Sequence, residues 1–447
     1  MQKLKEPLVI IGLGKTGLSC ARFLLENNYR IQVMDTRSSP PCLTEIQKIL
    51  NTEQIFLNGL NVEILLNAGT LVVSPGISIQ TPEIVKAKAS GVEIIGDVEI
   101  FSRFLQQKAH KKIIAITGSN GKSTVTDMMN FVLNRAGFKA QMCGNIGIPV
   151  LEVIQKQVEY YVLELSSFQL ETTHSLNAEV GCILNITPDH MDRYDSLADY
   201  ENAKLCLLKQ SKSAVLPYAN SWEVPESIDV VDFGVYSLAK VYVGPYQNQN
   251  WLYVNGTPWI DCGQLHIYGQ HNWLNVLAVI GMLIQLNIEL TQTIKQAIMD
   301  YQGLAHRCQF ITKSQGIVWI NDSKATNVAS TEAAIFSFQL EYKKRLVLIA
   351  GGDSKEADLS PLKPLMNENL AGLIVLGMDA QKLVDLMEDK EKTLKVKNLQ
   401  EAVVHAHKFL PEGGMVLLSP ACSSLDMFKN FEDRGEQFCK TVRELYA

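Results

Sequence analysis

The sequence has no CxxC pair, because its nine cysteines are scattered singly along 447 residues. This pattern indicates neither a disulfide framework nor a cysteine-rich zinc site, and a reducing cytoplasm is the compartment that fits. No apolar run approaches the roughly 18 residues that a membrane-spanning helix needs. The short apolar stretch near the N-terminus ends in a glycine turn, so we interpret it as a first strand and not as a signal peptide.

The sequence also lacks an excess of basic residues. It has 41 Lys and Arg residues against 47 Asp and Glu residues, a net charge of −6, which argues against a general nucleic-acid binder. The composition is otherwise that of a globular protein, with 47% hydrophobic and 20% charged residues. A chain of this length should form about two to four domains, each with a large core.

The most informative stretch that is present is KKIIAITGSNGKST, residues 111–124. Its apolar run predicts a buried parallel strand, TGSNGK predicts a tight turn, and the residues from Ser123 to Gly137 have the periodicity of a helix. Glycine backbone N–H groups and the helix dipole together favour an anion at such a turn. Lys122 would then reach the β- and γ-phosphates of a nucleotide, and the Ser123 hydroxyl would ligate Mg²⁺.

This loop is shorter than the standard phosphate-loop motif, because Ile116 stands where that motif has its first glycine, five positions before Gly121. The alternative interpretation is an ordinary strand–helix turn that contains GKS by chance. The apolar strand before the turn and the regular helix after it favour the phosphate loop.

Residues 1–97 have the pattern of one nucleotide-binding unit. The motif GLGKTG joins a strand to a helix, a second strand ends at Asp35, and residues 70–76 and 92–97 read as further strands. The literal interpretation is a dinucleotide site in which Asp35 binds a ribose hydroxyl, as in an NAD-dependent oxidoreductase. Arg37 suits a phosphate or carboxylate better, and a structural domain without a ligand is a third interpretation.

In the predicted central domain, residues 98–303, polar residues follow strands on the edge that carries the phosphate loop. Glu164 lies near the end of one strand, and Asp189 and His190 come just after the next. Because the carboxyl ends of parallel strands share one rim of the sheet, we expect these side chains to lie on the same edge as Lys122. A carboxylate and an imidazole beside a phosphate loop suit Mg²⁺-assisted phosphoryl transfer.

Other parts of the central domain are less informative. Lys204 has the pattern of an ordinary solvent-facing helix lysine. Residues 221–262 are irregular and read as an antiparallel subsheet or an insertion. Asn272 and Asn275 begin a helix, where they either cap it or bind a base edge, and capping is the commoner role.

Residues 304–447 have the pattern of a third α/β unit in which four strand-like runs each lead into a polar loop. Arg307 lies just before the first of these runs, at the domain junction. Loops so rich in donors suit a small anionic substrate or nucleotide phosphates. The polar residues on them are Asp322, Lys324, Thr326, Lys355, Ser423, Ser424 and Arg434.

Seven segments taken together resemble the Mur ligases: TGSNGKST, GNIG, ELSSFQLE, DHMDRY, LAHRCQF, NDSKATN and SPACSSLDMFKNFEDRG. The resemblance runs nearly end to end and in order. It implies an α/β fold of three domains: a Rossmann-like N-terminal domain (1–97), a central domain of the P-loop ATPase type (98–303), and a Rossmann-like C-terminal domain (304–447).

The resemblance also implies an activity. The enzyme would be an ATP-dependent ligase of peptidoglycan precursor synthesis that adds D-glutamate to UDP-N-acetylmuramoyl-L-alanine through an acyl phosphate. It would use two Mg²⁺ ions and act as a cytoplasmic monomer, with no nucleic-acid or membrane partner. The rivals are a different Mur ligase or a folylpolyglutamate synthetase, a catalytically silent nucleotide-binding regulator, and an NAD-dependent oxidoreductase.

The resemblance further implies which residues contact the nucleotide-linked substrate and ATP. Contacts with uracil or diphosphate would come from Thr16, Thr36 and Arg37, and the muramoyl portion would lie against Gly76, Asn145, Ser166 and Gln169. ATP would be bound by Gly118, Ser119, Asn120, Gly121, Lys122, Ser123 and Thr124 of the loop, and by Asn272, Asn275, Arg307 and Asp322.

The same resemblance implies the metal and amino-acid sites. One Mg²⁺ would be held by Ser123 and Glu164, and the second by His190 and a carbamylated Lys204. The catalytic residues would be Lys122, His190 and Lys204. D-Glutamate would be bound by Lys324, Thr326, Lys355, Ser424, Leu425 and Phe431, with Leu425 and Phe431 acting through backbone N–H groups.

Overall fold

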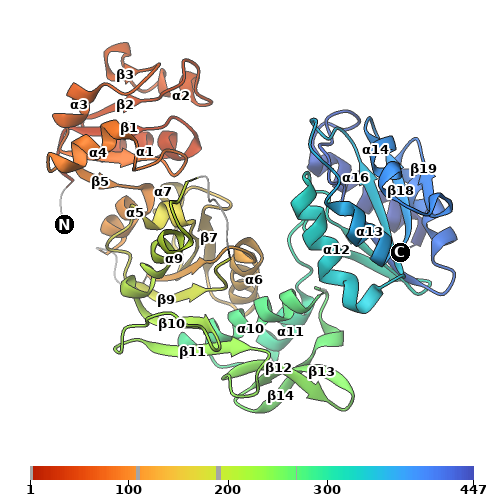
Figure 1. Ribbon diagram of the computed structural model, residues 1–447. Helices are drawn as coiled ribbons and strands as arrows, with labels where there is room; N and C mark the ends of the chain where they lie inside the picture. The colour runs from red at the N-terminus through yellow and green to blue at the C-terminus, as the bar shows by residue number, and fades with distance from the viewer. Residues whose placement is uncertain (1–3, 107–110, 188–192, 268, 447) are drawn as a thin grey trace. The chain divides into compact units, whose positions relative to one another are not determined.

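The structure is a computed structural model that describes residues 4–106, 111–187, 193–267 and 269–446 (Figure 1). The chain divides into two compact units: Met1–Asp261 with Leu274–Ala297, and Cys262–Trp273 with Ile298–Ala447. The first unit contains two β-sheets and the second unit contains one. No helix within the described ranges is both long and apolar enough to cross a membrane.

The N-terminal sheet has five parallel strands in the order β3-β2-β1-β4-β5, with β1 at its centre as in a Rossmann-like fold. Alternate residues of β1 enter two different cores: Leu8 and Ile10 pack on the side of α1, and Val9 and Ile11 on the side of α3 and α4. The strands are β1 (Leu8–Ile11), β2 (Ile31–Met34), β3 (Ile55–Phe56), β4 (Thr70–Val73) and β5 (Glu93–Ile95). The helices are α1 (Lys15–Glu26), α2 (Leu43–Ile46), α3 (Val62–Leu66) and α4 (Pro82–Ala89).

The central sheet has nine strands in the order β14-β13-β12-β11-β10-β9-β6-β8-β7, and β6, which leads into the phosphate loop, lies between β9 and β8. The strands are β6 (Lys112–Thr117), β7 (Ala140–Gly144), β8 (Tyr160–Glu164), β9 (Ala178–Ile183), β10 (Ser211–Pro217), β11 (Asp229–Gly234), β12 (Val241–Tyr246), β13 (Gln249–Val254) and β14 (Thr257–Asp261). The helices from this part of the chain are α5 (Asp97–Leu105), α6 (Lys122–Arg135), α7 (Val150–Val153), α8 (Ser167–Leu170), α9 (Leu197–Leu205), α10 (Gln270–Gln285) and α11 (Gln292–Asp300).

The far end of the central sheet confirms the prediction of an antiparallel subsheet within residues 221–262. β13 pairs antiparallel with both β12 and β14 (Figure 1). Two-residue turns join these strands, and each has two consecutive residues with positive φ: Gln247 and Asn248 in one, Asn255 and Gly256 in the other. That backbone geometry is the one that tight hairpins favour.

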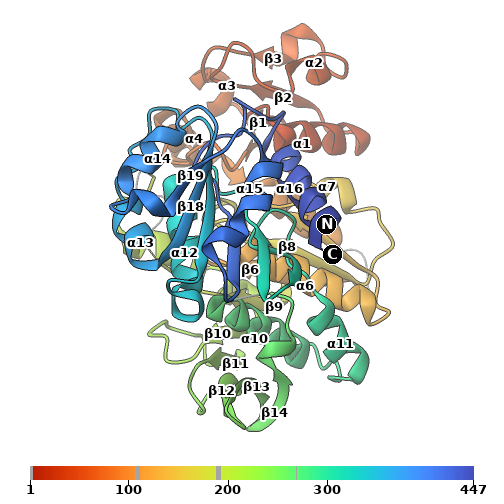
Figure 2. The ribbon, with the colours of Figure 1, turned by 90° about the vertical axis from the view of Figure 1, so that its right-hand side faces the viewer.

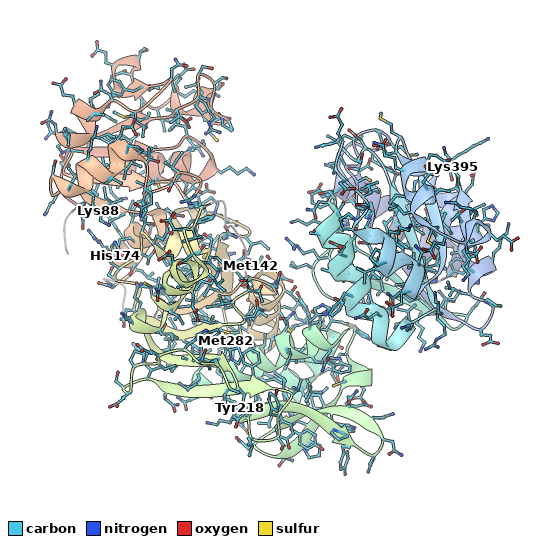
Figure 3. The ribbon with its side chains drawn as sticks, viewed as in Figure 1. Lys88, Met142, His174, Tyr218, Met282 and Lys395 are labelled. Carbon is cyan, nitrogen blue, oxygen red and sulfur yellow. The ribbon has the colours of Figure 1, made fainter. Side chains whose placement is uncertain are left out.

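The N-terminal and central sheets share one continuous hydrophobic core. Helix α5 joins them through the buried carboxylate of Glu99, which accepts hydrogen bonds from the backbone N–H groups of His174 (2.7 Å) and Ser175 (2.9 Å). Arg103, one turn later, donates to Glu99 at 2.7 Å and also pairs with Glu93 of β5. His174 is labelled in Figure 3. These buried, fully paired charges fix the first two sheets as one unit.

The C-terminal sheet has six strands in the order β15-β16-β20-β17-β18-β19, and only its edge strand β15 runs antiparallel. Helices α12, α13 and α14 pack on one face, and α15 and α16 pack on the other (Figure 2). The strands are β15 (Gln309–Ser314), β16 (Ile317–Asn321), β17 (Leu346–Gly351), β18 (Leu370–Leu376), β19 (Thr393–Lys395) and β20 (Gly414–Leu418). The helices are α12 (Val328–Tyr342), α13 (Leu362–Asn369), α14 (Ala380–Leu386), α15 (Leu399–His405) and α16 (Phe431–Tyr446).

One buried acid at the start of α5 makes the stability of the first unit depend on pH. Asp97 is 3% exposed, and one of its carboxylate oxygens, Oδ1, has no hydrogen-bond partner in the described ranges. Burial raises the pKa of Asp97 to about 6, although hydrogen bonds from the Val98 N–H and the Gln169 side chain act in the opposite direction. The folded protein therefore holds a proton on Asp97 at pH values where the unfolded chain has released it.

In the wild type, protonated Asp97 adds to the free energy of unfolding below about pH 4, and this contribution is lost as pH rises through about 6. We predict that Asp97→Asn removes this pH-dependent contribution. At about 1.4 kcal/mol per pKa unit, this contribution reaches about 3 kcal/mol. Urea unfolding followed at several pH values between about 4.5 and about 7.5 should show the Asp97→Asn variant gaining stability relative to the wild type as pH rises. The exposed Asp229 supplies the control, Asp229→Asn, which should run parallel to the wild type. Parallel curves for the Asp97→Asn variant would contradict the prediction.

Candidate functional site

The predicted phosphate loop is a left-handed glycine turn between β6 and α6. Gly118 has φ +149° and Gly121 has φ +85°, and α6 begins at the next residue, Lys122. A Cβ atom on Gly121 would lie 2.6 Å from Oδ1 of Asn275. Both the backbone conformation and the lack of space therefore require glycine at this position.

The loop is held by the segment that follows β9. The Ser119 hydroxyl donates to the Thr187 carbonyl at 2.9 Å and lies 3.0 Å from the Tyr200 hydroxyl. The Asn120 N–H donates to Oδ1 of Asn185 at 2.8 Å, and the Asn185 amide donates back to the Asn120 carbonyl at 3.0 Å. Strand β9 ends at Ile183, and beyond it the Asn185 side chain and the Thr187 backbone bond to the loop.

Two lysines place positive charge on this loop. The Lys122 Nζ donates to the carbonyls of Gly118 (2.9 Å) and Ser119 (2.8 Å). Lys204 is only 1% exposed, and its Nζ donates to the same Gly118 carbonyl at 2.9 Å. The prediction of a solvent-facing Lys204 is therefore wrong. It lies one helical turn after the buried Tyr200, so both side chains face inward, and the Lys204 Nζ is 4.6 Å from the Tyr200 ring centroid.

Glu164 lies on the strand edge where we expected it. It ends β8 and is the register partner of Ile116 in β6, directly beside the phosphate loop. The side chain is 2% exposed, and its Oε1 accepts a 2.6 Å hydrogen bond from Asn145, whereas its buried Oε2 has no hydrogen-bond partner among the described residues. Asp189 and His190, which we expected on the same edge, lie outside the described residues.

A cavity of about 530 Å³ lies in the same unit, where the loops of the N-terminal sheet face those of the central sheet. Six of the seven residues predicted to bind the nucleotide-linked substrate line this cavity, and the seventh, Ser166, is joined to Gln169 by a capping box. The lining residues are Gly12, Gly14, Lys15, Thr16, Thr36, Arg37, Ser74, Pro75, Gly76, Ile77, Gly144, Asn145 and Gln169.

The GLGKTG turn brings the N-terminus of α1 to this cavity. A Cβ atom on Gly17 would lie 1.9 Å from the Gly12 carbonyl oxygen, so the tight turn requires glycine there. Lys15 and Thr16 form the first turn of the 12-residue helix α1 and line the cavity. The N–H groups of that turn and the helix dipole favour an anion, such as a diphosphate.

Asp35 does not present a carboxylate to the cavity. Its side chain is fully buried, with Oδ2 accepting from the Leu13 N–H at 2.7 Å and Oδ1 accepting from the Arg37 N–H at 2.9 Å and its Nε at 2.8 Å. Burial alone would raise the pKa of Asp35, but the hydrogen bonds from Arg37 and Leu13 lower it to about 2. The literal dinucleotide interpretation needed this carboxylate for a ribose hydroxyl, and the protein itself occupies both oxygens.

Arg193 is a cavity-supporting residue that the sequence analysis missed. Its guanidinium donates to the carbonyls of Pro75 (2.8 Å) and Ile77 (2.9 Å) and lies 3.8 Å from the centroid of the Phe168 ring. It thereby holds the loop after β4, which carries Gly76, against the central sheet. The sequence marks the loop that Arg193 holds, because the SPG turn follows an apolar strand directly and so lies at the carboxyl edge of the sheet. It gives no comparable signal for Arg193 itself.

In the second unit, Asp322 lies at the carboxyl end of β16. Its Oδ1 accepts from the Cys308 N–H at 3.1 Å and its Oδ2 accepts from the Ser419 hydroxyl at 2.7 Å. Burial raises the pKa of Asp322 to about 6 against the effect of these hydrogen bonds. Arg307 and Asn272 belong to this unit as well, whereas Asn275 belongs to the first unit.

The residues predicted to bind an amino acid lie on loops after adjacent strands of the C-terminal sheet. The Lys324 Nζ, in the loop after β16, is 5.5 Å from the Phe431 ring centroid. Ser424, in the loop after β20, is 3% exposed. Lys355 follows β17 and has φ +51°, with Glu356 next to it at φ +62°. Two consecutive non-glycine residues in the left-handed region are strained, a feature that clusters at functional sites.

Two other residues of this group, Thr326 and Leu425, are exposed. Thr326 lies two residues after Lys324, and its backbone N–H donates to the Lys324 carbonyl at 2.8 Å. Leu425 is 64% exposed. Arg434 was predicted to lie among the donors on the loops, but it is 2% exposed and lies beneath them, because its guanidinium bonds to their backbone carbonyls.

Comparison with protein families assigns all three sheets of the chain. Residues 6–96 match the family described as Mur ligase MurD-like, N-terminal domain. Residues 116–283 match the Mur ligase middle domain, and residues 306–422 match the Mur ligase glutamate ligase domain.

Similar curated proteins cover nearly the whole chain. The chain is 40% identical to the UDP-N-acetylmuramoylalanine–D-glutamate ligase of Saccharophagus degradans, over 99% of this chain and 98% of that protein. It is 42% identical to the protein of the same name from Baumannia cicadellinicola, over 98% of this chain and 97% of that protein. In Pseudomonas aeruginosa the identity is 39%, over 98% of both chains.

Solved structures share the fold at low identity. The MurF ligase of Thermotoga maritima, solved in complex with ADP, gives a TM-score of 0.58 at 15% identity, over 99% of this chain and 96% of that chain. A UDP-N-acetylmuramoyl-L-alanyl-D-glutamate–2,6-diaminopimelate ligase gives a TM-score of 0.61 at 15% identity, over 87% of this chain and 94% of that chain. These likenesses confirm the three-domain α/β architecture.

The phosphate loop offers a matched pair of glycines for a test. Gly121 and Gly137 flank helix α6 with φ of +85° and +92°, but a Cβ atom would be crowded at Gly121 and would meet nothing within 4 Å at Gly137. We predict that Gly121→Ala weakens ATP binding at least about tenfold, or about 1.4 kcal/mol, in isothermal titration calorimetry. Gly137→Ala should cost about 1 kcal/mol of stability and leave ATP affinity unchanged. Equal affinities for the two variants would contradict the assigned role of the loop.

Proposed function

The chain belongs to the Mur ligase family, and we propose that it is an ATP-dependent ligase that joins D-glutamate to the L-alanyl carboxyl group of UDP-N-acetylmuramoyl-L-alanine. The observation that carries this proposal is the convergence of the phosphate loop, Glu164 and the cavity of about 530 Å³ in one unit. Relatives at about 40% identity over the full chain, named for this activity, support it.

The reaction that we propose has two steps. The substrate carboxylate attacks the γ-phosphorus of ATP and forms an acyl phosphate with release of ADP. The neutral amine of D-glutamate then attacks the acyl carbon, and the tetrahedral intermediate collapses to an amide and inorganic phosphate. Phosphorylation is needed because oxide is a very poor leaving group, whereas phosphate is a good one.

We propose that the phosphate loop binds the triphosphate. The N–H groups of residues 118–124 and the N-terminus of α6 would face the phosphate oxygens, and Lys122 would move its Nζ from the loop carbonyls to the β- and γ-phosphates. The attacking carboxylate and the γ-phosphate are both anionic, so positive charge placed between them lowers the barrier. The remaining nucleotide contacts would come from Asn272, Asn275, Arg307 and Asp322.

The residues at the loop fit a divalent cation. Within the part of the chain that the structure describes, the buried Glu164 Oε2 has no hydrogen-bond partner, and a carboxylate oxygen is the hard donor that Mg²⁺ prefers. We propose that Ser123 and Glu164 hold one Mg²⁺ and that His190 and Lys204 hold a second. Bound Mg²⁺ would supply positive charge to the phosphate oxygens. Asn145, which bonds to Glu164 Oε1, would keep that carboxylate oriented.

Lys204 fits this role when its side chain is carbamylated, which is our further proposal. A buried ammonium would repel a nearby metal ion, whereas a carbamate replaces the cation with a carboxylate-like oxygen donor.

For the other two substrates, we propose that Thr16, Thr36 and Arg37 contact the uracil or the diphosphate. Gly76, Asn145, Ser166 and Gln169 would line the muramoyl portion. D-Glutamate would be bound in the second unit by Lys324, Thr326, Lys355, Ser424 and the backbone N–H groups of Leu425 and Phe431.

We propose functional domains at residues 1–97, 98–303 and 304–447, and an enzyme that works as a cytoplasmic monomer. The cysteines of the described chain are all free thiols, which suits a reducing compartment.

We predict ATP-dependent phosphate release from the wild-type enzyme with UDP-N-acetylmuramoyl-L-alanine and D-glutamate. Turnover with L-glutamate or L-lysine should be lower by about 100-fold or more, and Lys122→Ala should lose about 10³-fold in kcat. The exposed Lys139, just beyond the same helix, supplies the control Lys139→Ala, which should keep wild-type activity. A preference for L-lysine would indicate a different Mur ligase, and an active Lys122→Ala variant would contradict the phosphate role.

We predict a carbamate on Lys204 in protein equilibrated with ¹³C-bicarbonate and Mg²⁺. Carbon NMR should show a carbamate resonance in the wild type and in Lys209→Ala, an exposed lysine five residues away, but not in Lys204→Ala. A spectrum without that resonance in the wild type, or one that keeps it in Lys204→Ala, would sink this part of the proposal.

A further inference from the structure

Arg434, near the start of α16, is among the largest fully buried side chains of the described protein, at 2% exposed. Its Nε donates to the Ser323 hydroxyl at 2.9 Å, and its Nη2 donates to the Ser323 carbonyl at 2.8 Å. Its Nη1 donates to the carbonyls of Cys422 at 3.1 Å and Gly351 at 3.5 Å. Every one of these acceptors is a neutral oxygen.

These acceptors belong to the loops after three neighbouring strands. Ser323 follows β16, Cys422 follows β20, and Gly351 ends β17, and these strands pair in parallel in the order β16-β20-β17. One planar guanidinium therefore bonds to the carboxyl ends of three adjacent strands. Its rigid fork of donors makes this possible, because a lysine ammonium has no such geometry.

Ser323 closes the arrangement. Its hydroxyl accepts from the Arg434 Nε and donates to the carbonyl of Phe431 at 2.8 Å, so the first residue of α16 joins the same network. The network thus ties together four segments, and three of them carry candidate amino-acid ligands next to the bonded residues. In those segments Lys324 follows Ser323 directly, Ser424 comes two residues after Cys422, and Phe431 is itself a member.

We propose that Arg434 is a positioning residue for the amino-acid site: its guanidinium, with Ser323, sets the spacing of the loops that bind D-glutamate. The inference rests on the proposed function and deepens it, because it concerns the same site. Arg434 lies beneath the loops and acts through them. It holds the Lys324, Ser424 and Phe431 segments in one arrangement, much as outer residues orient the ligands of a metal site.

The charge of Arg434 adds to this role. Its nitrogens form no hydrogen bond to a carboxylate within the described chain. Asp426 and Cys422 lie near enough to raise the pKa of Arg434, which opposes the effect of burial. Burial lowers the pKa of Arg434 to about 10, so the group stays protonated at neutral pH. The positive charge below the loops, which Asp426 only partly offsets, favours the binding of the glutamate carboxylates above them.

The test compares Arg434→Lys with Arg443→Lys, an exposed arginine nine positions later on the same helix. A lysine at position 434 keeps the charge but reaches only one loop at a time. We expect its KM for D-glutamate to rise at least about tenfold, with the KM values for ATP and the nucleotide-linked substrate within about twofold of the wild type. Arg443→Lys should leave all three KM values unchanged, and thermal unfolding by circular dichroism should report intact folding for both variants.

Ser323→Ala is the second variant, because it removes the hydroxyl between Arg434 and Phe431 with little change in volume. We expect it to raise the KM for D-glutamate by about threefold. The inference would be overturned if a folded Arg434→Lys variant had an unchanged KM for D-glutamate. If that variant does not fold, an unchanged KM in Ser323→Ala would overturn it. An equal rise in all three KM values would also overturn it, since that would indicate a general structural role. A wild-type enzyme without D-glutamate-dependent turnover would instead contradict the proposed function, and this inference with it.

Discussion

Parallel strands deliver their carboxyl ends to one edge of a sheet, and this constraint decides where the candidate residues of all three sheets lie. Thr36 and Gly76 follow strands of the first sheet, Gly118 and Glu164 follow or end strands of the second, and Ser424 follows a strand of the third. Backbone groups at such edges have no further ladder partner, so they are free to bond to phosphates, carboxylates or supporting side chains. The carboxyl edge of a parallel sheet therefore offers unpaired backbone groups for ligand binding. The candidate residues lie at the carboxyl edges of all three sheets.

Charged side chains beneath the surface hold the sheets and loops near these edges in place. Glu99 accepts four hydrogen bonds, two from backbone N–H groups and the others from Arg103 and Ser175, and so joins the first two sheets. Arg193 does the same for the loop that carries Gly76, and Arg434 does it for the loops of the third sheet. Glu99 and Arg434 are buried, Arg193 is half-buried, and all three donate or accept several hydrogen bonds, which makes their removal far more costly than the loss of a surface ion pair. The positions of the candidate ligand-binding residues thus depend on side chains that would not themselves contact a ligand.

The sequence predicted the fold well, because apolar runs, glycine turns and helix periodicity are local signals. The turn before α6 and the position of Glu164 on the edge beside it both follow from the strand–turn–helix pattern. Lys204 was misjudged from its pattern, because its inward orientation depends on the packing of Tyr200 against the phosphate loop, which is a contact between distant segments. Arg434 was misplaced for the same reason: a polar residue in a polar stretch reads as exposed, and only the three carbonyl-bearing loops above it show otherwise. Asp35 had the spacing of a ribose ligand, but its carboxylate is occupied by Arg37 and Leu13.

The candidate residues for the two steps of the proposed reaction belong to different compact units. The phosphate loop, Glu164 and the substrate cavity belong to the first unit, and the proposed D-glutamate loops belong to the second. In the proposed reaction, the amine of D-glutamate must come within bonding reach of a carbon activated at the phosphate loop. Each unit is internally fixed by buried hydrogen bonds, such as those of Glu99 in the first unit and Arg434 in the second. Water competes with the amine for an acyl phosphate, so the proposed reaction requires that water be excluded from the activated carbon until the amine attacks.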